Sequence, residues 1–164
     1  MSTNELELQQ KFTWSRTGVY ETYNAILGRY QVQEALKYAR GHSLLDAPCG
    51  DGALTEMMLS RFDRVVGIDA SETHLALARD RLPNGEFHQT LLEDFDTEER
   101  FGTITMINVL EHVVDPIYAL QRMARLLMPG GILIVHVPNA LAINRRLAVK
   151  MGTLTECEEL SPFD

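Results

Sequence analysis

The sequence LLDAPCGDG, from Leu44 to Gly52, places an aspartate where an apolar run gives way to a loop rich in proline and glycine. The two leucines predict a short buried strand, and the two glycines predict a tight loop whose backbone a ligand can approach closely. Glycine loops of this kind often bind phosphate groups at the start of the following helix. A carboxylate repels phosphate, so the charge of Asp46 decides what kind of ligand this loop can hold.

Strand and helix patterns alternate around this loop, from residue 43 to residue 138. Alternation of this kind predicts a parallel sheet with right-handed crossovers and helices on both faces. The strands are rich in isoleucine, valine and leucine, as in sheets that are buried on both faces. The fold class that follows is α/β, a Rossmann-like, doubly wound and mostly parallel sheet whose ligand binds beyond the carboxyl ends of the strands. We expect strands at 43–47, 64–69, 86–92, 101–108 and 132–138, and helices at 20–40, 53–61, 71–81, 116–128 and 140–150.

Several residues set the expected ends of these helices. Gly28 is expected to break the first helical pattern into two helices. Ser71 is a candidate N-cap, and Asp115 followed by Pro116 is a typical N-cap and N1 pair. The PGG sequence at 129–131 is expected to end the helix that begins at Pro116. The inward face of that helix is expected to hold Ile117, Leu120, Met123 and Leu127.

The composition excludes several classes of function. The formal net charge of −8 argues against general affinity for nucleic acid or an anionic membrane, which needs clustered lysine and arginine. Cys49 and Cys157 form no CxxC pair, which indicates a reducing cytoplasm without a disulfide framework or a zinc site. The start, MSTNELELQQ, is unlike a signal or transit peptide, and no apolar run approaches the ~20 residues of a membrane span. We therefore expect a soluble, cytoplasmic protein with no nucleic-acid partner.

Three interpretations compete for the loop sequence DAPCGDG. In the first, the loop is a dinucleotide fingerprint, G-x-G-x-x-G, and the protein is a nicotinamide-dependent oxidoreductase. Gly50 and Gly52 supply the first two glycines, but Thr55 occupies the third position and two aspartates would lie near the diphosphate. In the second, the ligand joins a nucleoside to a cationic tail, as S-adenosyl-L-methionine does, and Asp46 faces its ammonium group directly or through water. In the third, the loop is a plain turn between a strand and a helix.

A second acid favours the nucleoside interpretation. Asp69 ends the expected strand 64–69, and it follows Gly52 at close to the ~20-residue spacing at which an acid reaches the ribose hydroxyls of a nucleoside. Asp69 could instead cap the next helix, but Ser71 can do this unaided. The order of loop, strand and acid therefore makes a nucleoside ligand the stronger interpretation.

Four motifs together resemble the class I S-adenosylmethionine-dependent methyltransferases. They are LLDAPCGDG at 44–52, VVGIDAS at 65–71, INVLEHVVDP at 107–116 and LMPGGILIVHVPN at 127–139. The closest resemblance is to the small-molecule branch that includes the ubiquinone-biosynthesis O-methyltransferases, and it covers about 43–139. It implies transfer of a methyl group from S-adenosyl-L-methionine to a hydroxyl or amine of a small molecule, with S-adenosyl-L-homocysteine as the product.

The resemblance also implies roles for individual residues. The glycine loop would cradle the methionine part of the cofactor, and Asn108 would lie near its tail. Asp69 would bind the ribose hydroxyls, with Ala70 beside the adenosine. Two leucines after the third strand would flank the adenine, and Tyr23 would close over the cofactor from the first helix. The residues implied to bind the cofactor are Asp46, Ala47, Pro48, Cys49, Gly50, Gly52, Asp69, Ala70, Leu91, Leu92, Asn108 and Tyr23.

Two positions depart from the usual pattern of these methyltransferases. Pro48 stands where the first glycine of the loop usually lies, which stiffens the loop and removes one backbone N–H. Leu91 stands where an acid or amide often contacts the amino group of adenine. The contact with the amino group of adenine would then be made by Glu93, by Asp94 or by the backbone.

The sequence after the fourth strand carries the candidate catalytic residue. His112 is the candidate general base, because it follows that strand where the strand order reverses and because imidazole takes up protons near neutral pH. In the other interpretation, Glu111 and His112 brace the start of the next helix. Some related methyltransferases bind a divalent ion through a Glu-x-x-Glu-His cluster and a later histidine. Here Asn108 replaces the first glutamate and leaves Glu111, His112 and His136, so we expect no required metal.

The resemblance divides the chain into three regions. Residues 1–42 are expected to form an N-terminal arm and helices that cap the cofactor site, 43–139 the cofactor-binding core, and 140–164 the start of an acceptor-side region. The sheet of this family usually has seven strands, and five are expected here. Either the natural protein continues further, or a partner chain, such as the second copy in a homodimer, covers the open edge. A module that binds the cofactor without transferring a methyl group is the main alternative function.

Overall fold

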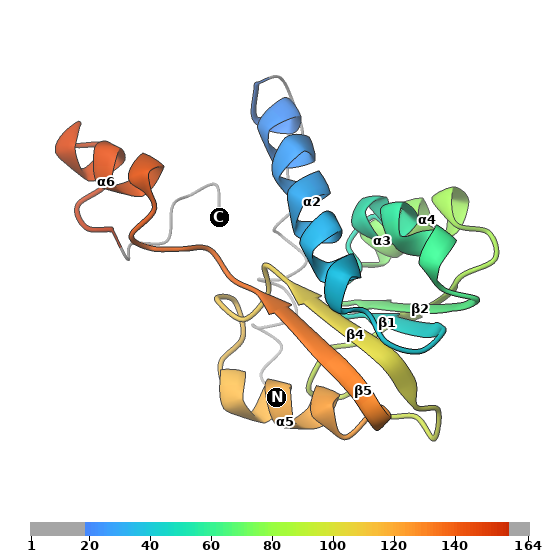
Figure 1. The fold of residues 1–164 in the computed structure, drawn as a ribbon. Coiled ribbons are helices and arrows are strands. Elements are labelled where there is room, and N and C mark those ends of the chain that lie inside the picture. Colours follow the sequence, from blue (N-terminus) through green and yellow to red (C-terminus); the bar gives the residue numbers. More distant parts are fainter. Residues whose placement is uncertain (1–18, 158–164) are drawn as a thin grey trace.

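The computed structural model describes residues 19–157, so predictions for residues 1–18 and 158–164 lie outside the described part of the chain. It contains a parallel sheet with helices on both faces (Figure 1). The strands are β1 (Ser43–Asp46), β2 (Arg64–Asp69), β3 (Glu86–Gln89), β4 (Phe101–Ile107) and β5 (Leu127–His136). The helices are α2 (Val19–Tyr38), α3 (Ala53–Met58), α4 (Glu72–Arg81), α5 (Pro116–Ala124) and α6 (Ile143–Lys150), with a 3₁₀ turn, η1 (Leu59–Arg61), after α3.

The strands of this part of the chain lie in the order β3-β2-β1-β4-β5, and all neighbouring pairs are parallel. The chain runs outward from β1 to β3 and then continues with β4 on the other side of β1, so the strand order reverses between β1 and β4. In sheets of this kind, ligands bind beyond the carboxyl ends of the strands at the reversal. The predicted fold class, a Rossmann-like doubly wound sheet, is confirmed.

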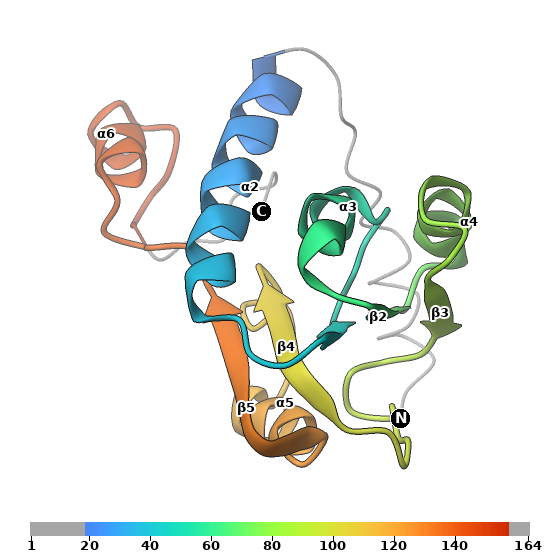
Figure 2. The same cartoon turned by 45° about the vertical axis from the view of Figure 1, so that its right-hand side comes forward.

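The helices form two layers, one on each face of the sheet (Figure 2). α2, α3 and α4 lie on one face, where Leu44 of β1 packs with Val32 of α2 and Met58 of α3. α5 covers the other face, where Leu45 of β1 packs with Met123 of α5. Neighbouring residues of a strand point to opposite faces, so these two leucines are buried in different layers, as a strand covered on both faces requires.

The first helix is continuous, which corrects the expectation that Gly28 would break it. α2 runs without interruption from Val19 to Tyr38. A Cβ at position 28 would lie 2.6 Å from Cδ2 of Leu54 in α3, so the glycine lets the two helices approach closely. Gly28 is therefore a packing residue and does not end a helix.

The junction between α5 and β5 also differs from the prediction. α5 ends before the PGG sequence at 129–131, which lies inside β5. Phe101 of β4 pairs with Leu127, but Thr103 pairs with Ile132, so the two strands shift register between these pairs. The extra residues of β5 bulge out at this shift, and a bulge in an edge strand tolerates proline and glycine. Leu127, expected on the inward face of a helix, is therefore a strand residue.

The predicted helix starts are confirmed. Ser71 caps α4 and Asp115 caps α5, each through a side-chain oxygen that accepts from a backbone N–H of the first turn. Pro116 is the first residue of α5. Besides Leu127, the predicted inward face of α5 is wrong at Ile117, which is 64% exposed, and the helix buries Ala119 instead.

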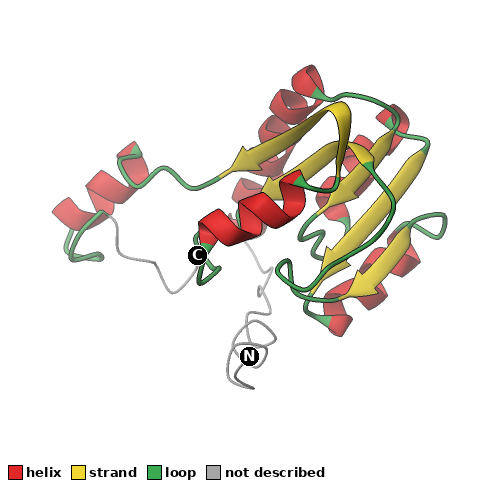
Figure 3. Ribbon diagram, turned by 90° about the horizontal axis from the view of Figure 1, so that it is seen from below, coloured by secondary structure: helices red, strands yellow, loops and turns green. Residues whose placement is uncertain are grey.

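β5 forms one edge of the sheet. Within residues 19–157, no further strand pairs with its outer side. α6 follows β5 and projects away from the sheet (Figure 3). The helices of the described region include none that is long and apolar enough to cross a membrane. The outer side of β5 is therefore where a further strand or a partner chain could pair.

Candidate functional site

One cavity opens at the carboxyl ends of β1, β2, β3 and β4, where the strand order reverses. Its walls come from the loops that follow these strands and from the first turn of α4. The residues predicted from the sequence that line it are Pro48, Asp69, Ala70, Leu91, Leu92, Asn108 and His112. The other lining residues are Ile68, His74, Thr90, Glu93, Val109 and Val113.

Asp69 lies at the end of β2 and connects the glycine loop to α4. The residue is 8% exposed. Its Oδ2 accepts a hydrogen bond from the backbone N–H of Gly50 at 3.0 Å, and its Oδ1 accepts one from the N–H of Ser71 at 2.8 Å. The Nδ1 atom of His74 lies 3.4 Å from Oδ1. Each carboxylate oxygen can accept more than one hydrogen bond, so Asp69 can also accept donors from a ligand in the cavity.

The two glycines of the loop have different surroundings. Both have positive φ, 54° at Gly50 and 78° at Gly52, a conformation that favours glycine. A Cβ at Gly52 would lie 3.2 Å from the Cα and Cβ of Ala78, so this glycine lets α4 pack against the loop. A Cβ at Gly50 would meet no atom within 4 Å. The open space is therefore beside Gly50, and Gly52 has a packing role.

Two loop residues predicted to bind the cofactor have side chains that are buried in the core. Ala47 is fully buried and belongs to the core on the α5 face. Cys49 packs with Leu75 and Phe87 in the core beside α4. Its burial, together with the nearby carboxylates, raises the pKa of the thiol far above its ordinary value. Neither residue lines the cavity, so a contact with a ligand there would come from the backbone.

Asp46 does not face the cavity, which corrects the expectation drawn from the sequence. The residue is 2% exposed. Its carboxylate accepts hydrogen bonds from Oγ1 of Thr55 in α3 at 2.6 Å and from Oγ1 of Thr105 in β4 at 2.7 Å. Burial raises the pKa of Asp46 to about 6, although the two threonine hydroxyls lower it, and the charge of Asp69 adds a smaller increase. Asp46 therefore joins β1 to α3 and β4, and its charge acts on the loop from the protein interior.

The carboxylates around the loop decide which ligand fits. A diphosphate would need free backbone N–H groups in the loop and at the start of α3. The N–H of Gly50 instead donates to Asp69, and the N–H of Ala53 donates to Oδ1 of Asp51 at 3.2 Å. Carboxylates thus already occupy the positions that an anion would take. The site fits a nucleoside with a cationic tail and does not fit a diphosphate.

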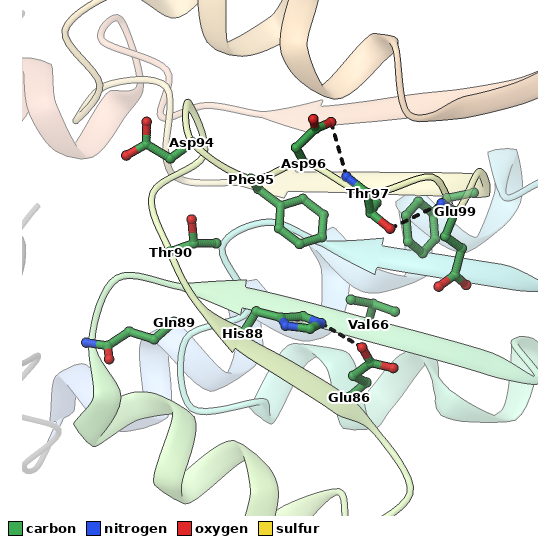
Figure 4. Close-up of a pocket in the computed structure, with 11 residues that line it drawn as sticks. Val66, Glu86, His88, Gln89, Thr90, Asp94, Phe95, Asp96, Thr97 and Glu99 are labelled. Atoms are coloured by element: carbon green, nitrogen blue, oxygen red, sulfur yellow. Dashed lines mark hydrogen bonds and ion pairs between the residues drawn. The ribbon is translucent and has the colours of Figure 1, made fainter.

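The segment after β3 lies between two cavities. β3 ends at Gln89, earlier than predicted. Glu93 lines the first cavity together with the two leucines that were predicted to flank adenine. Asp94 lines a neighbouring cavity beside the edge strand β3 (Figure 4). The sequence left the adenine contact open between Glu93 and Asp94, and of these two acids Glu93 is the one beside the leucines.

β4 is followed by a residue with left-handed backbone at the edge of the cavity. Asn108 has a φ of 54° and is, among the described residues, the one non-glycine residue with positive φ. Its N–H donates to the backbone oxygen of His136 in β5 at 2.9 Å. Its Oδ1 accepts a hydrogen bond from Nε2 of Gln31 in α2 at 3.1 Å. α2, β4 and β5 are therefore joined at Asn108.

His112 lines the cavity after β4. Its Nε2 lies 3.9 Å from Oε1 of Glu111, too far for a normal hydrogen bond but within the range of an ion pair when the imidazole is charged. This geometry accords with either predicted role, a general base or a brace. His136 does not line the cavity, and residues 19–157 contain no group of three or more His, Cys, Asp or Glu that could hold a metal ion. The expectation that no metal is required stays a prediction.

Three further residues bear on the site: Tyr23, which was predicted, and Gln31 and His74, which were not. Tyr23 lies in α2, but its side chain is outside the described part, so its place over the cofactor stays a prediction. Gln31 gave no signal, because its partner Asn108 is 77 positions away. His74 could have been found, since it lies in the first turn of a helix whose cap was recognised and so follows closely on Asp69.

Comparison with known protein sequences gives a consistent set of relatives. A sequence profile described as "Methyltransferase domain" matches residues 24–163. The chain is 38% identical over 114 residues to the ubiquinone biosynthesis O-methyltransferase of Alkalilimnicola ehrlichii, which covers 66% of this chain and 46% of that protein. It is 35% identical over 137 residues to the ubiquinone biosynthesis O-methyltransferase of Actinobacillus pleuropneumoniae serotype 5b, which covers 77% of this chain and 56% of that protein. The chain spans about half the length of these curated relatives.

Two solved structures resemble the described fold. The N-methyltransferase NodS from Bradyrhizobium japonicum WM9, in complex with S-adenosyl-L-homocysteine, has a TM-score of 0.64 at 23% identity and covers 80% of this chain and 70% of its own. At this level of identity the similarity concerns the fold. CalS10, an amino pentose methyltransferase from Micromonospora echinaspora with bound S-adenosylmethionine, has a TM-score of 0.62 at 29% identity and covers 75% of this chain and 57% of its own.

Proposed function

Because the chain belongs to the methyltransferase domain family, we propose that it transfers a methyl group from S-adenosyl-L-methionine to a hydroxyl or amine of a small molecule. The observation that carries this proposal is the cavity beside Asp69 and the glycine loop, where carboxylates occupy the N–H groups that a diphosphate would need. A nucleoside with a cationic tail is the ligand that fits. The names of the ubiquinone biosynthesis relatives and of CalS10 support a small molecule as the acceptor.

At the nucleoside end, Asp69 accepts hydrogen bonds from the ribose hydroxyls. It lines the cavity, and its oxygens have acceptor capacity beyond the two backbone N–H groups that they already bind. Ala70 lies beside the adenosine, and Leu91 and Leu92 flank the adenine. Glu93 accepts a hydrogen bond from the adenine amino group, in place of the acid or amide that often stands at the position of Leu91 in this family.

At the methionine end, the loop supplies space and charge. Gly50 leaves room for the ligand beside the backbone, and Pro48 and Asn108 line the cavity. Asp46 contributes negative potential from beneath the loop once it is ionised, without touching the ligand. Tyr23 closes over the cofactor from α2. These contributions favour a cationic amino-acid tail and disfavour an anionic one.

Catalysis needs the acceptor atom in line with the methyl carbon and, for many acceptors, a base that removes a proton. When bound, S-adenosyl-L-methionine supplies a methyl group that its sulfonium has already activated. The cavity holds the acceptor atom in line with that carbon. A hydroxyl or ammonium acceptor must also lose a proton, and His112, which lines the cavity, takes it. Glu111, with its Oε1 3.9 Å from Nε2 of His112, stabilises the imidazolium that forms.

The outer parts of the chain are assigned from the pattern of the family. Residues 1–42 cap the cofactor site, 43–139 form the cofactor-binding core, and 140–164 contribute to the acceptor side. A second copy of the chain, in a homodimer, or a further segment covers the outer side of β5. A net charge of −8 and two free cysteines are typical of a cytoplasmic protein without a nucleic-acid partner.

Titration calorimetry with S-adenosyl-L-methionine and S-adenosyl-L-homocysteine tests the cofactor. Wild type is expected to bind both, and Asp69→Ala to lose about 10- to 100-fold in affinity, because hydrogen bonds to a charged group contribute ~1.5–3 kcal/mol. Asp80→Ala, an exposed acid of α4, is the matched control and should bind as wild type does. Asp69→Asn keeps an oxygen that can accept from the N–H of Gly50, so the loop should stay in place. A loss of affinity in this variant then comes from the ribose contact and not from unfolding of the loop. Unchanged affinity in Asp69→Ala would mean that the ribose site is assigned wrongly.

Transfer of a labelled methyl group to a panel of hydroxyl and amine acceptors tests the reaction. Transfer to one class supports an enzyme and identifies the acceptor atom. Cofactor binding without transfer to any acceptor would favour a binding module. Tight binding of NADH without binding of S-adenosyl-L-methionine would favour an oxidoreductase instead.

A further inference from the structure

Asn108 has an unusual backbone conformation and is held from two sides. A φ of 54° is uncommon for any residue with a Cβ, although asparagine tolerates it better than most. The N–H of Asn108 is bound to the oxygen of His136, and its side-chain oxygen is bound to Gln31. Asn108 also lines the cavity. The direction of its side chain at the cavity wall is therefore set by a residue of α2.

Gln31 is half-buried and lies beside the packed face of α2. The next buried positions, Val32 and Ala35, are 3% and 1% exposed and belong to the part of the helix that packs on the sheet side. On the N-terminal side, Gly28 packs against α3, while Ile26 and Tyr30 are 50% and 64% exposed. Figure 1 shows this N-terminal part of α2 rising past the carboxyl ends of β4 and β5. The hydrogen bond of Gln31 thus joins Asn108, at the cavity wall, to α2.

We propose that Gln31 is a positioning residue, which fixes Asn108 for contact with the cofactor and couples the N-terminal part of α2 to occupancy of the cavity. The inference rests on the proposed function, since it takes S-adenosyl-L-methionine as the occupant. A ligand that contacts Asn108 stabilises the conformation in which its Oδ1 accepts from Gln31. By reciprocity, loss of the Gln31 contact weakens ligand binding by the same factor.

Two substitutions of Gln31 separate the hydrogen bond from the packing. Gln31→Leu keeps much of the side-chain volume and removes the donor, so affinity for S-adenosyl-L-homocysteine is expected to fall about five-fold, the usual effect of one hydrogen bond. Gln31→Glu keeps the shape of the side chain but can only accept, so it turns the amide of Asn108 over or repels its Oδ1, and affinity is expected to fall in this variant as well. Gln33→Leu, an exposed glutamine of the same helix, is the control and should bind as wild type does. In an Asn108→Ala background, Gln31→Leu should cause no further loss.

Hydrogen exchange provides a readout that a purely structural role would not change. In wild type, S-adenosyl-L-homocysteine is expected to slow amide exchange both at 108–113 and in the N-terminal part of α2. In Gln31→Leu, the ligand should still protect 108–113 but should protect the N-terminal part of α2 less than in wild type. Wild-type affinity in Gln31→Leu, or ligand protection of α2 equal to that of wild type in that variant, would overturn the inference and leave the proposed function standing.

A ligand-free measurement keeps the two proposals distinguishable. If wild type binds neither S-adenosyl-L-methionine nor S-adenosyl-L-homocysteine, the proposed function fails. The positioning role then predicts faster exchange at 107–110 in Gln31→Leu than in Gln33→Leu, because the first variant alone releases Asn108. Equal exchange in the two variants would overturn the positioning role as well.

Discussion

Replacement of Asp46 by asparagine is expected to change how the stability of this protein depends on pH. Burial raises the pKa of Asp46 from its ordinary value of 3.8 to about 6, against the opposing hydrogen bonds from Thr55 and Thr105. The folded protein therefore binds this proton more tightly than the unfolded chain does. By linkage, the contribution of Asp46 to the free energy of unfolding falls as the pH rises from 3.8 to about 6, and it stays at the lower value above that interval.

The size of the effect follows from the pKa difference. A rise from 3.8 to about 6, at ~1.36 kcal/mol per pKa unit, corresponds to roughly 3 kcal/mol. Asparagine has nearly the same shape and does not ionise, so it removes this cost. Its amide accepts from one threonine hydroxyl and donates to the oxygen of the other, so most of the contact survives. The stability gain of Asp46→Asn over wild type should therefore be about 2.5 kcal/mol larger at pH 7.5 than at pH 4.

Urea denaturation followed by circular dichroism between pH 4 and pH 8 measures this difference. Asp80→Asn changes an exposed acid of α4, and its profile should run parallel to that of wild type. Thr105→Val removes one donor that lowers the pKa of Asp46, so the fall in stability should move to higher pH. Parallel profiles for wild type and Asp46→Asn would refute the reasoning, because they would mean that burial does not raise the pKa of this carboxyl.

Three further predictions concern the cavity and its loop. Gly52→Ala is expected to lower the free energy of unfolding, measured in urea, by about 1–3 kcal/mol, because its Cβ would crowd α4 and the residue has positive φ. Gly50→Ala should lower the free energy of unfolding by only ~1 kcal/mol, because a Cβ there has open space, but it should weaken cofactor binding in calorimetry. Glu93→Gln should reduce the preference for S-adenosylhomocysteine over its inosine analogue about five-fold, and Asp94→Asn should leave that preference unchanged. An unchanged preference in both variants would mean that neither acid contacts adenine. His112→Gln should lower kcat ~100-fold or more while the cofactor Kd stays unchanged. A wild-type kcat in this variant would mean that His112 braces the start of the next helix and does not act as the base.

Features that depend on neighbouring residues could be predicted from the sequence. Ser71 and Asp115 cap their helices through backbone N–H groups of the first turn, and both caps form as expected. The alternation of strands and helices, with the rule that crossovers are right-handed, gave the parallel sheet. That sheet brings the carboxyl ends of β2 and β4 to the same side, which is why Asp69 and Asn108 line the same cavity.

Features that depend on distant residues could not be predicted. The partners of Asp46 lie 9 and 59 positions away, so the direction of its carboxylate is set by the packing of α3 and β4. The bond between Gln31 and Asn108 spans 77 positions. The PGG sequence at 129–131 carries a local turn signal, but pairing with β4 draws it into β5. In each case a contact made by the tertiary fold outweighs the local pattern.

The buried carboxylates beneath the loop connect folding stability to the choice of ligand. Asp46 and Asp69 are both almost fully buried, and the charge of Asp69 raises the pKa of Asp46. Their repulsion is poorly screened by water, so it raises the energy of the ligand-free protein. A diphosphate would increase that repulsion, whereas S-adenosyl-L-methionine carries one net positive charge and would relieve it. Affinity for S-adenosyl-L-methionine should therefore rise as the pH increases through about 6, where Asp46 ionises, while affinity for the neutral product should change little. Calorimetry at pH 5 and pH 7.5 measures this, and a rise that persists in Asp46→Asn would assign the effect to another group.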